Sequence, residues 1–276
     1  MIIAVVGLGI IGGSFAKAIK KYTNHYVIGL NRTKETLNRA FAEGAVDEAG
    51  DKESLKKADL VILCLYPAAA VEFTQKYGEY FKKGAVVTDS SGIKSEICPK
   101  MTALSREYGF VFVGSHPMAG KEKNGYAVSD ADLYNGASYI ITPCEADDRA
   151  VELVSELALK IGFGQIKITT PREHDRMIAF TSQLPHVLAC AYVSSPCCPN
   201  HKGFSAGSYR DVSRVANINS ELWSELFLEN RESLIRELDI LTENITKIRN
   251  AVYDNDRERL KELLEKGHKV KEALGE

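Results

Sequence analysis

His116 is the residue of this sequence whose type and surroundings best suit proton transfer. It lies in the segment GSHPMAG, residues 114–120, directly after the apolar run 110–113. Such a run is typical of a buried parallel strand, and ligands bind at the carboxyl ends of these strands. Histidine can act as a general base near neutral pH. A second interpretation stays open, in which His116 is a buried histidine that ends a strand by bonding to its own loop.

A glycine motif near the N-terminus suggests the second reactant, a dinucleotide. Residues 2–6 form a short β run, Gly7-x-Gly9-x-x-Gly12 follows, and a helical pattern begins at once. In this context the first glycine makes a tight turn, the second lets the backbone approach a pyrophosphate, and the third lets the helix pack on the strand. The alternative is a glycine-rich turn that binds nothing. The predicted cofactor-binding residues here are Gly7, Leu8, Gly9, Ile10, Ile11 and Gly12, together with Leu65 at the end of a later strand.

The end of the second predicted strand, residues 26–30, bears on the choice of cofactor. Enzymes that select NAD usually carry Asp or Glu there, whereas this chain has Asn31, Arg32 and Thr33. A guanidinium beside a hydroxyl can bind a 2′-phosphate, which a carboxylate would repel. The sequence therefore favours NADP, and NAD stays possible if Arg32 is only a solvated residue before the next helix.

The elements that must position these residues alternate between strand and helix as far as residue 170. Strands are expected at 59–65, 85–89, 138–143 and 165–169, with helices at 34–43, 68–81 and 146–161 and another ending at 108. This alternation predicts a parallel or mostly parallel sheet covered on both faces. We expect an α/β Rossmann-type doubly wound dinucleotide-binding domain at 1–170 and an all-α substrate and dimerisation domain at 171–276.

Helical periodicity dominates after Pro171. Helices are expected at about 173–195, 208–217, across 219–250, and at 254–272. The leucines of the long helix keep one face apolar, and a second subunit is the natural cover for it. We therefore predict a homodimer, with an internal bundle of one chain as the alternative. The leucines are Leu222, Leu226, Leu234, Leu238 and Leu241.

Composition excludes several other classes. The 276 residues carry a net charge of -2 and 45% hydrophobic residues, so no global field favours nucleic acid or an anionic membrane. No apolar stretch approaches the roughly 18–20 residues of a membrane span. Six scattered cysteines and a strand beginning at residue 2 predict reduced thiols and a cytoplasmic protein without a signal peptide. Cys197, Cys198 and His201 share one loop, but adjacent cysteines chelate poorly and no second ligand pair follows, so no metal site is predicted.

Several polar clusters in the second half carry a resemblance to a known family. They are Glu173-His174-Asp175, Ser182-Gln183-Leu184-Pro185-His186, and Gly207-Ser208-Tyr209-Arg210-Asp211 followed by Arg214. With the glycine motif and the His-Pro-Met-Ala-Gly block, their order resembles the prephenate and arogenate dehydrogenases of tyrosine biosynthesis over nearly the whole chain. The resemblance implies a dinucleotide domain, a helical domain that builds an intertwined homodimer, and NAD(P)-dependent oxidative decarboxylation of prephenate or arogenate.

The resemblance also implies roles for individual residues. His116 would take the proton of the substrate hydroxyl, Arg214 would hold a substrate carboxylate, and His186 would be a second substrate-binding histidine. Further candidates for the substrate site are Gly207, Arg210, Asp211, Ser91, Ser182 and Glu122. Glu122, Lys123 and Asp175 match a polar network near the pocket entrance, with surface salt bridges as the alternative for these three.

One departure from the family pattern concerns the partner of His116. Many members carry Asp-x-x-Ser-x-Lys, and the serine bonds the catalytic histidine, whereas this chain has Gly92 in residues 89–94. Ser91, a backbone group or water could orient His116 instead. Other functions remain as alternatives: a β-hydroxyacid dehydrogenase or imine reductase, which usually depend on a group in the helical domain, or a dinucleotide sensor without catalysis.

Overall fold

The sheet that carries the site is eight-stranded in the computed structural model, which describes residues 1–121 and 123–275. Its order is β3-β2-β1-β4-β5-β6-β7-β8, and every pair is parallel except β6 with β7. The mostly parallel sheet is therefore confirmed. The strands are β1 (Ile2–Val6), β2 (Tyr26–Leu30), β3 (Glu48–Ala49), β4 (Leu60–Leu63), β5 (Val86–Asp89), β6 (Val111–Pro117), β7 (Ser138–Thr142) and β8 (Gln165–Ile168).

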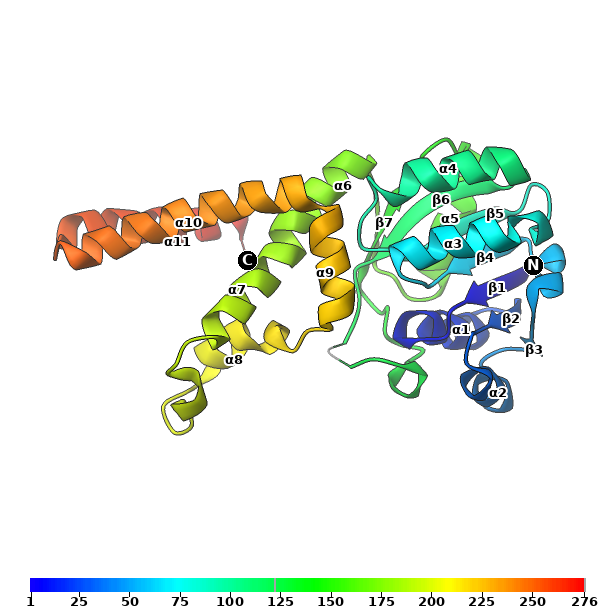
Figure 1. Ribbon diagram of the computed structural model, residues 1–276, viewed down its shortest axis with the longest axis horizontal. Coiled ribbons are helices and arrows are strands. Elements are labelled where there is room, and N and C mark those ends of the chain that lie inside the picture. The colour runs from blue at the N-terminus through cyan, green and yellow to red at the C-terminus, as the bar shows by residue number, and fades with distance from the viewer. Residues whose placement is uncertain (122, 276) are drawn as a thin grey trace.

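Helices cover both faces of this sheet, as Figure 1 shows. Successive side chains of a strand point to opposite faces, so Ile3 and Val5 of β1 join one apolar core while Ala4 and Val6 join the other. Helices α1, α2 and α5 contribute to the first core, and α3 and α4 contribute to the second. Their bounds are α1 (Ile10–Tyr22), α2 (Lys34–Ala42), α3 (Pro67–Tyr77), α4 (Ile97–Tyr108) and α5 (Asp148–Lys160).

Strand β6 is longer than the sequence predicted. The strand continues beyond the apolar run through Gly114 to Pro117, because these residues pair antiparallel with β7. His116 lies opposite Ile140 in this pairing, so it belongs to the strand and not to a turn beyond it. A residue held in a paired strand has a fixed backbone, which suits a side chain that must be aimed.

The elements after Pro171 are helical. Thr170 caps α6 by accepting from the Glu173 amide, and Pro171 occupies the first turn. A π-helical turn (Ala179–Gln183) then leads into α7. The helices are α6 (Pro171–Ile178), α7 (Leu184–Val193), α8 (Gly207–Ser213), α9 (Ser220–Glu229), α10 (Arg231–Tyr253) and α11 (Arg257–Leu274).

The single long helix expected at 219–250 is wrong. The chain bends at Asn230, which has φ -109° and ψ 27° and separates α9 from α10. Asn230 is buried, and its side-chain amide donates to the Asp175 carbonyl and to Gln183 Oε1, both at 2.8 Å. These bonds fix the bend, so α9 packs beside the sheet domain while α10 leads away from it. Figure 1 shows α10 and α11 as a hairpin that projects from the rest of the molecule. Within the described residues, no helix is both long and apolar enough to cross a membrane.

Candidate active site

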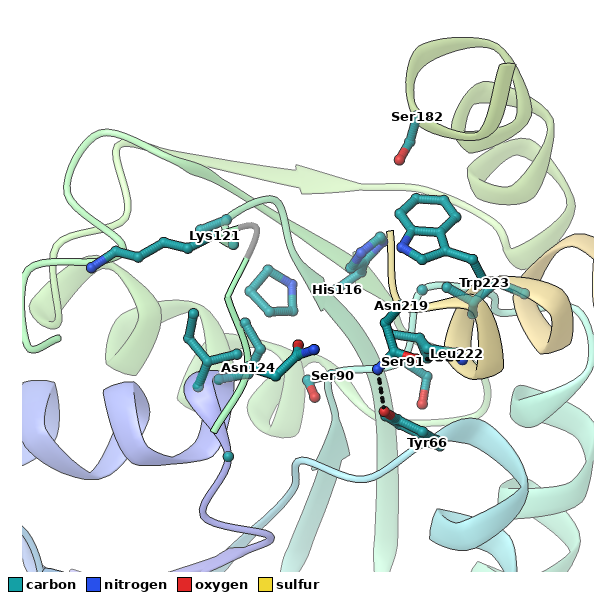
Figure 2. Close-up of a pocket in the computed structure, with 18 of the residues that line it drawn as sticks. Tyr66, Ser90, Ser91, His116, Lys121, Asn124, Ser182, Asn219, Leu222 and Trp223 are labelled. Carbon is teal, nitrogen blue, oxygen red and sulfur yellow. Dashed lines mark hydrogen bonds between the residues drawn. The ribbon is translucent and has the colours of Figure 1, made fainter. Parts of the chain in front are cut away.

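A cavity of about 590 Å³ lies where the carboxyl ends of the strands meet the helical part. Residues that follow β1, β4 and β5 line it, as do the end of β6 and side chains of α7 and α9. Figure 2 shows His116 within it, with Trp223 and Leu222 of α9 on one side and Lys121 and Asn124 on the other. Ile178 and Leu226 line the cavity and belong, with Ile93, to a small buried apolar cluster.

His116 is held as a neutral base in this cavity. Burial lowers the pKa of its imidazole well below the ordinary value of 6.5, and the nearby ammonium of Lys94 also opposes protonation. The neutral form is the one that can accept a proton. His116 is therefore ready to act as a base at neutral pH without first losing a proton.

A histidine of α6, His174, forms a hydrogen bond to the imidazole of His116 on the side away from the cavity. Its Nδ1 lies 3.0 Å from Nε2 of His174, and Nδ1 of His174 lies 2.6 Å from Oδ1 of Asp175. Both α6 residues are buried, at 1% and 3% exposure. Burial opposes ionisation of Asp175, but hydrogen bonds from His174 and Ser95 outweigh it, so the pKa of this carboxyl lies below its usual value. Asp175 is thus part of the core behind His116 and not, as predicted, near the pocket entrance.

A buried ion pair supports the floor of the site. Lys94 Nζ lies 2.5 Å from Oδ2 of Asp89, and neither side chain is exposed to solvent. The same carboxylate accepts from the Ser115 amide and the Ser91 amide, both at 2.9 Å. Asp89 therefore ties the end of β5 to the residue before His116, which couples the loop 90–94 to the base.

The position where the family has a serine is open in this chain. A Cβ at Gly92 would lie 3.8 Å from Cε1 of His116 and at ordinary contact distance from Leu226. Neighbouring Ser91 is 3% exposed and lines the cavity, yet its hydroxyl has no hydrogen-bond partner among the described residues. A buried hydroxyl without a partner is costly, so a ligand group in the cavity would satisfy it.

Three other predicted substrate residues line the same cavity: His186, Arg214 and Ser182. His186 donates from Nδ1 to the Ser182 carbonyl at 2.8 Å, and its ring stacks on Trp223 with centroids 3.7 Å apart. Arg214 follows α8 and provides a guanidinium that can bind a carboxylate bidentately. The cavity therefore combines a base, a cation and an aromatic stack.

The glycine motif forms the other half of the cavity. Gly7 has φ +90°, and a Cβ there would lie 2.4 Å from the Cys64 carbonyl oxygen. A Cβ at Gly12 would lie 1.9 Å from the Gly7 carbonyl oxygen, so only glycine allows this approach. At Gly9, by contrast, no atom lies within 4 Å of the Cβ position, which leaves room for a ligand beside the backbone.

The first turn of α1 is suited to a pyrophosphate. Gly9 caps the helix without a side-chain bond, and the first turn carries no acidic residue. Its amides are therefore available to an anion, which the helix dipole also favours. Gly9, Ile10, Ile11, Gly12 and Leu65 line the cavity together with His116, whereas Gly7 and Leu8 are buried beneath it.

The residues predicted to contact the adenosine end lie outside this cavity. Asn31 accepts from the Leu8 amide at 2.9 Å and donates to the Thr33 carbonyl at 3.1 Å, so its side chain stabilises the turn after β1. Arg32 and Thr33 are exposed at the end of β2, and the Thr33 side chain does not cap α2. Both side chains can therefore turn toward a bound ligand.

Some predicted residues are not brought to the cavity within this chain. Gly207, Arg210 and Asp211 are exposed on α8, where Arg210 Nε lies 3.5 Å from Asp211 Oδ1. This pair has side chains that are 78% and 72% exposed, because α8 turns them to solvent. Lys123 is exposed as well and does not line the cavity. Glu122 lies outside the described residues.

Sequence reasoning missed two contributors to the site. Trp223 is the one tryptophan of the chain, and its place among the leucines of the predicted helix does not distinguish packing from ligand binding. His174 was visible in the cluster 173–175, but nothing in the sequence places it behind His116. In the loop with Cys197 and Cys198, His201 stacks on Tyr209 at 4.1 Å. No group of three or more potential metal ligands occurs in the part of the chain that the structure describes.

Comparison with known proteins covers both halves of the chain. The family model described as "Prephenate dehydrogenase, nucleotide-binding domain" matches residues 15–167, and "Prephenate dehydrogenase, dimerization domain" matches residues 170–266. The cyclohexadienyl dehydrogenase of Zymomonas mobilis is 30% identical over 282 residues, which cover 99% of this chain and 95% of that relative.

Two solved structures are similar in both fold and sequence. The prephenate dehydrogenase of A. aeolicus in complex with hydroxyphenyl propionate and NAD+ has a TM-score of 0.87 at 27% identity, covering 100% of this chain and 98% of that one. The arogenate dehydrogenase of Synechocystis has a TM-score of 0.84 at 26% identity, with coverage of 99% and 100%.

Proposed function

The chain belongs to the prephenate dehydrogenase family, and on this premise we propose that it oxidises and decarboxylates prephenate to 4-hydroxyphenylpyruvate, with His116 as the base. One observation carries the proposal. A neutral histidine and the open first turn of a glycine-motif helix line the same cavity, so a base and a dinucleotide can meet one substrate there.

The chemistry matches the residue types. Prephenate carries a hydroxyl on C4 and a carboxylate on C1 of a cyclohexadiene ring. When bound, the dinucleotide supplies the acceptor for the hydride from C4. His116 takes the hydroxyl proton through Nε2, so a carbonyl develops at C4. This carbonyl accepts the electron pair that is left when carbon dioxide departs from C1, and the ring becomes aromatic.

The remaining cavity residues would bind and orient the substrate. Arg214 is suited to one of the two substrate carboxylates, because a guanidinium can hold it with two parallel hydrogen bonds. His186, fixed by the Ser182 carbonyl and by Trp223, lines the same cavity and is the proposed second substrate-binding histidine. Ser91 has a buried hydroxyl to offer to either reactant.

NADP is the proposed dinucleotide, and NAD is the alternative. Support comes from Arg32 and Thr33, which are exposed at the end of β2, where enzymes of this fold meet the adenosine ribose. The carboxylate that would repel a 2′-phosphate is missing from this position, since Asn31 occupies it. The side-chain oxygen of Asn31 accepts a hydrogen bond from the Leu8 amide, so this oxygen is engaged within the protein.

Arogenate is the alternative substrate. The similarity to the Synechocystis arogenate dehydrogenase supports arogenate, and the similarity to the A. aeolicus prephenate dehydrogenase supports prephenate. The two compounds differ in the side chain on C1, which ends in a pyruvyl or an alanyl group. Both carry the hydroxyl and the ring carboxylate on which the proposed mechanism depends.

A homodimer is the proposed assembly. Helices α10 and α11 expose Ile235, Ile240, Ile245, Val252, Leu264 and Val270, each at 46% or more. An amphipathic hairpin that projects from the molecule needs a partner for these side chains, and the matching family model is a dimerization domain. Light scattering during size-exclusion chromatography measures the mass of the assembly. We expect the mass of two chains, and the mass of one chain would contradict the homodimer.

The activity itself is tested with four mixtures. Purified protein is given prephenate or arogenate, each with NAD or NADP, and the near-ultraviolet absorbance of reduced nicotinamide is followed while the aromatic product is identified. We expect reduction with prephenate and NADP, together with one carbon dioxide per reduced nicotinamide. Reduction only with arogenate would assign the alternative substrate, and no reduction in any mixture would reject the proposed function.

A further inference from the structure

The hydrogen bonds behind His116 form a directed chain of three side chains. It runs from Asp175 Oδ1 to His174 Nδ1 over 2.6 Å and from His174 Nε2 to His116 Nδ1 over 3.0 Å. Asp175 is itself fixed, because its two oxygens accept from the Lys94 amide at 2.8 Å and the Ser95 amide at 2.7 Å. Both amides lie in the loop between β5 and α4.

The direction of each bond follows from donor and acceptor chemistry. The pKa of Asp175 is below its usual value, so this carboxylate is ionised and can only accept. His174 must therefore carry its proton on Nδ1. Burial lowers the pKa of His174, so the ring is neutral and its Nε2 is an acceptor. His116 then has to donate from Nδ1, and its own lone pair lies on Nε2, the atom that faces away from α6.

We propose that His174, held by Asp175, is the positioning residue that fixes the tautomer and the orientation of His116. This inference rests on the proposed function and extends it to how the base is prepared. In the proton transfer the substrate O–H bond breaks and an N–H bond forms at Nε2 of His116. The imidazolium keeps its Nδ1 proton bonded to neutral His174, and ionised Asp175 balances part of the new charge.

Glycine at position 92 makes the hydrogen bond from α6 more important for orienting His116 in this chain. The family serine at this position would bond the histidine from the cavity side, and glycine has no side chain to do so. The nearest part of His116 to a Cβ at Gly92 is Cε1, at 3.8 Å. The α6 pair bonds to Nδ1 of His116 and does not line the cavity, so it fixes the ring without using cavity space.

Two further charged side chains, Lys94 and Asp89, lie near this chain of hydrogen bonds. Lys94 is ion-paired with Asp89, and both are buried beside the two histidines. The cation of Lys94 opposes protonation of either imidazole, while Asp175 favours it at His174. A positioning role needs both rings neutral at rest, which this balance supports.

A tautomer measurement tests the inference without relying on activity. Histidine labelled with ¹⁵N is introduced, and the side-chain nitrogens of His116 are assigned with the His116→Gln variant. We expect Nδ1 of His116 to be protonated and Nε2 unprotonated in the wild type, and this preference to be lost in His174→Leu. A wild-type His116 protonated on Nε2, or an unchanged tautomer in His174→Leu, would overturn the proposal.

Kinetics then connect the tautomer to catalysis. His174→Leu should lower kcat by about 10–100-fold, the usual range for loss of an orienting partner, with little change in KM. His174→Gln offers an amide oxygen near the position of Nε2 and should recover most of kcat. Equal losses in His174→Leu and His174→Gln would contradict a positioning role. An inactive wild type with the expected tautomer would reject the proposed function and leave the role of His174 supported.

Asn230→Ala is the matched control for structural damage. Asn230 is buried like the α6 pair, and its side-chain amide bonds to the Asp175 carbonyl and to Gln183 and not to either imidazole. This variant should unfold at a lower temperature and keep both the His116 tautomer and kcat. A loss of kcat in Asn230→Ala equal to that in His174→Leu would assign the effect to packing of α6 and overturn the proposal.

Discussion

The ring of Trp223 stacks on the ring of His186, with centroids 3.7 Å apart and planes inclined by 28°. The contact joins α9 to α7 across the wall of the cavity, and Figure 2 shows the indole facing into the same space as His116. Trp223 is also the one tryptophan in the sequence. Its fluorescence therefore reports on the cavity and on no other region.

Trp223 provides the first prediction. Titration with hydroxyphenyl propionate should change the intrinsic fluorescence, because a ring bound beside His186 alters the surroundings of the indole. Trp223→Ala should lower kcat/KM by about 2–13-fold, since an aromatic pair contributes about 0.5–1.5 kcal/mol beyond its buried area. Trp223→Phe, which keeps an aromatic ring, should lose less. Saturable binding without any fluorescence change would show that the ligand occupies another site.

The pH dependence of kcat/KM follows from the state of His116. The pKa of this imidazole lies well below 6.5, so the base is already neutral at pH 6.5 and activity should stay on its plateau there. Protonation at lower pH removes the acceptor lone pair, and kcat/KM should then fall. A half-maximal point above pH 6.5 on the acid side would contradict this assignment of the base.

Stability should decline on the same side of the pH scale. The folded state keeps His116 and His174 neutral, whereas in the unfolded chain they bind protons below their ordinary pKa of 6.5. The unfolded state therefore gains protons relative to the folded state as pH falls, and the free energy of unfolding decreases. Denaturant titrations at several pH values measure this, and stability that rises below pH 6.5 would contradict it.

The buried pair of Lys94 and Asp89 predicts a large effect on folding. Lys94→Met leaves a buried carboxylate without its cation and should lower the free energy of unfolding by about 3–5 kcal/mol. Lys100→Met breaks an exposed pair with Glu96, whose side chains are 55% and 49% exposed, and should cost less than about 1 kcal/mol. Equal losses in the two variants would show that burial of the Lys94 pair has no energetic consequence.

Cofactor preference should depend on Arg32. Arg32→Ala should raise KM for NADP by roughly 10–100-fold, because a hydrogen bond to a charged group contributes about 1.5–3 kcal/mol, and should leave KM for NAD unchanged. Arg39→Ala is the control, since Arg39 on α2 is also an exposed arginine but pairs with Glu43, directly after the helix. If Arg32→Ala changes both cofactors alike, Arg32 does not read the 2′-phosphate.

Most of the sheet could be predicted from the sequence because its signals are local. Apolar runs bounded by glycine and polar residues mark β1, β2, β4 and β5, and strand–glycine–helix spacing marks α1. The break at Asn230 could not be predicted, since it depends on bonds to Asp175 and Gln183, which lie 55 and 47 residues away in the chain. The leucine periodicity continues across the break and conceals it.

The candidate site was predictable in its parts and not in its arrangement. The motifs named His116, His186 and Arg214, which line one cavity. The contact between His116 and His174 spans 58 residues and joins β6 to α6, so no local pattern encodes it. Trp223 was concealed for a different reason, because a lone aromatic on a leucine-rich helix has the same pattern whether it packs or binds.

The most direct measurement compares the wild type with His116→Gln in the prephenate assay with saturating NADP or NAD. We predict that the wild type reduces nicotinamide and releases carbon dioxide in equal amounts. His116→Gln should lose about 10²–10⁴-fold in kcat, the usual contribution of a general base, while cofactor binding is unchanged. A folded wild type that reduces neither cofactor with prephenate or arogenate, or a His116→Gln variant as active as the wild type, would contradict the assignment of His116 as the base of an oxidative decarboxylation.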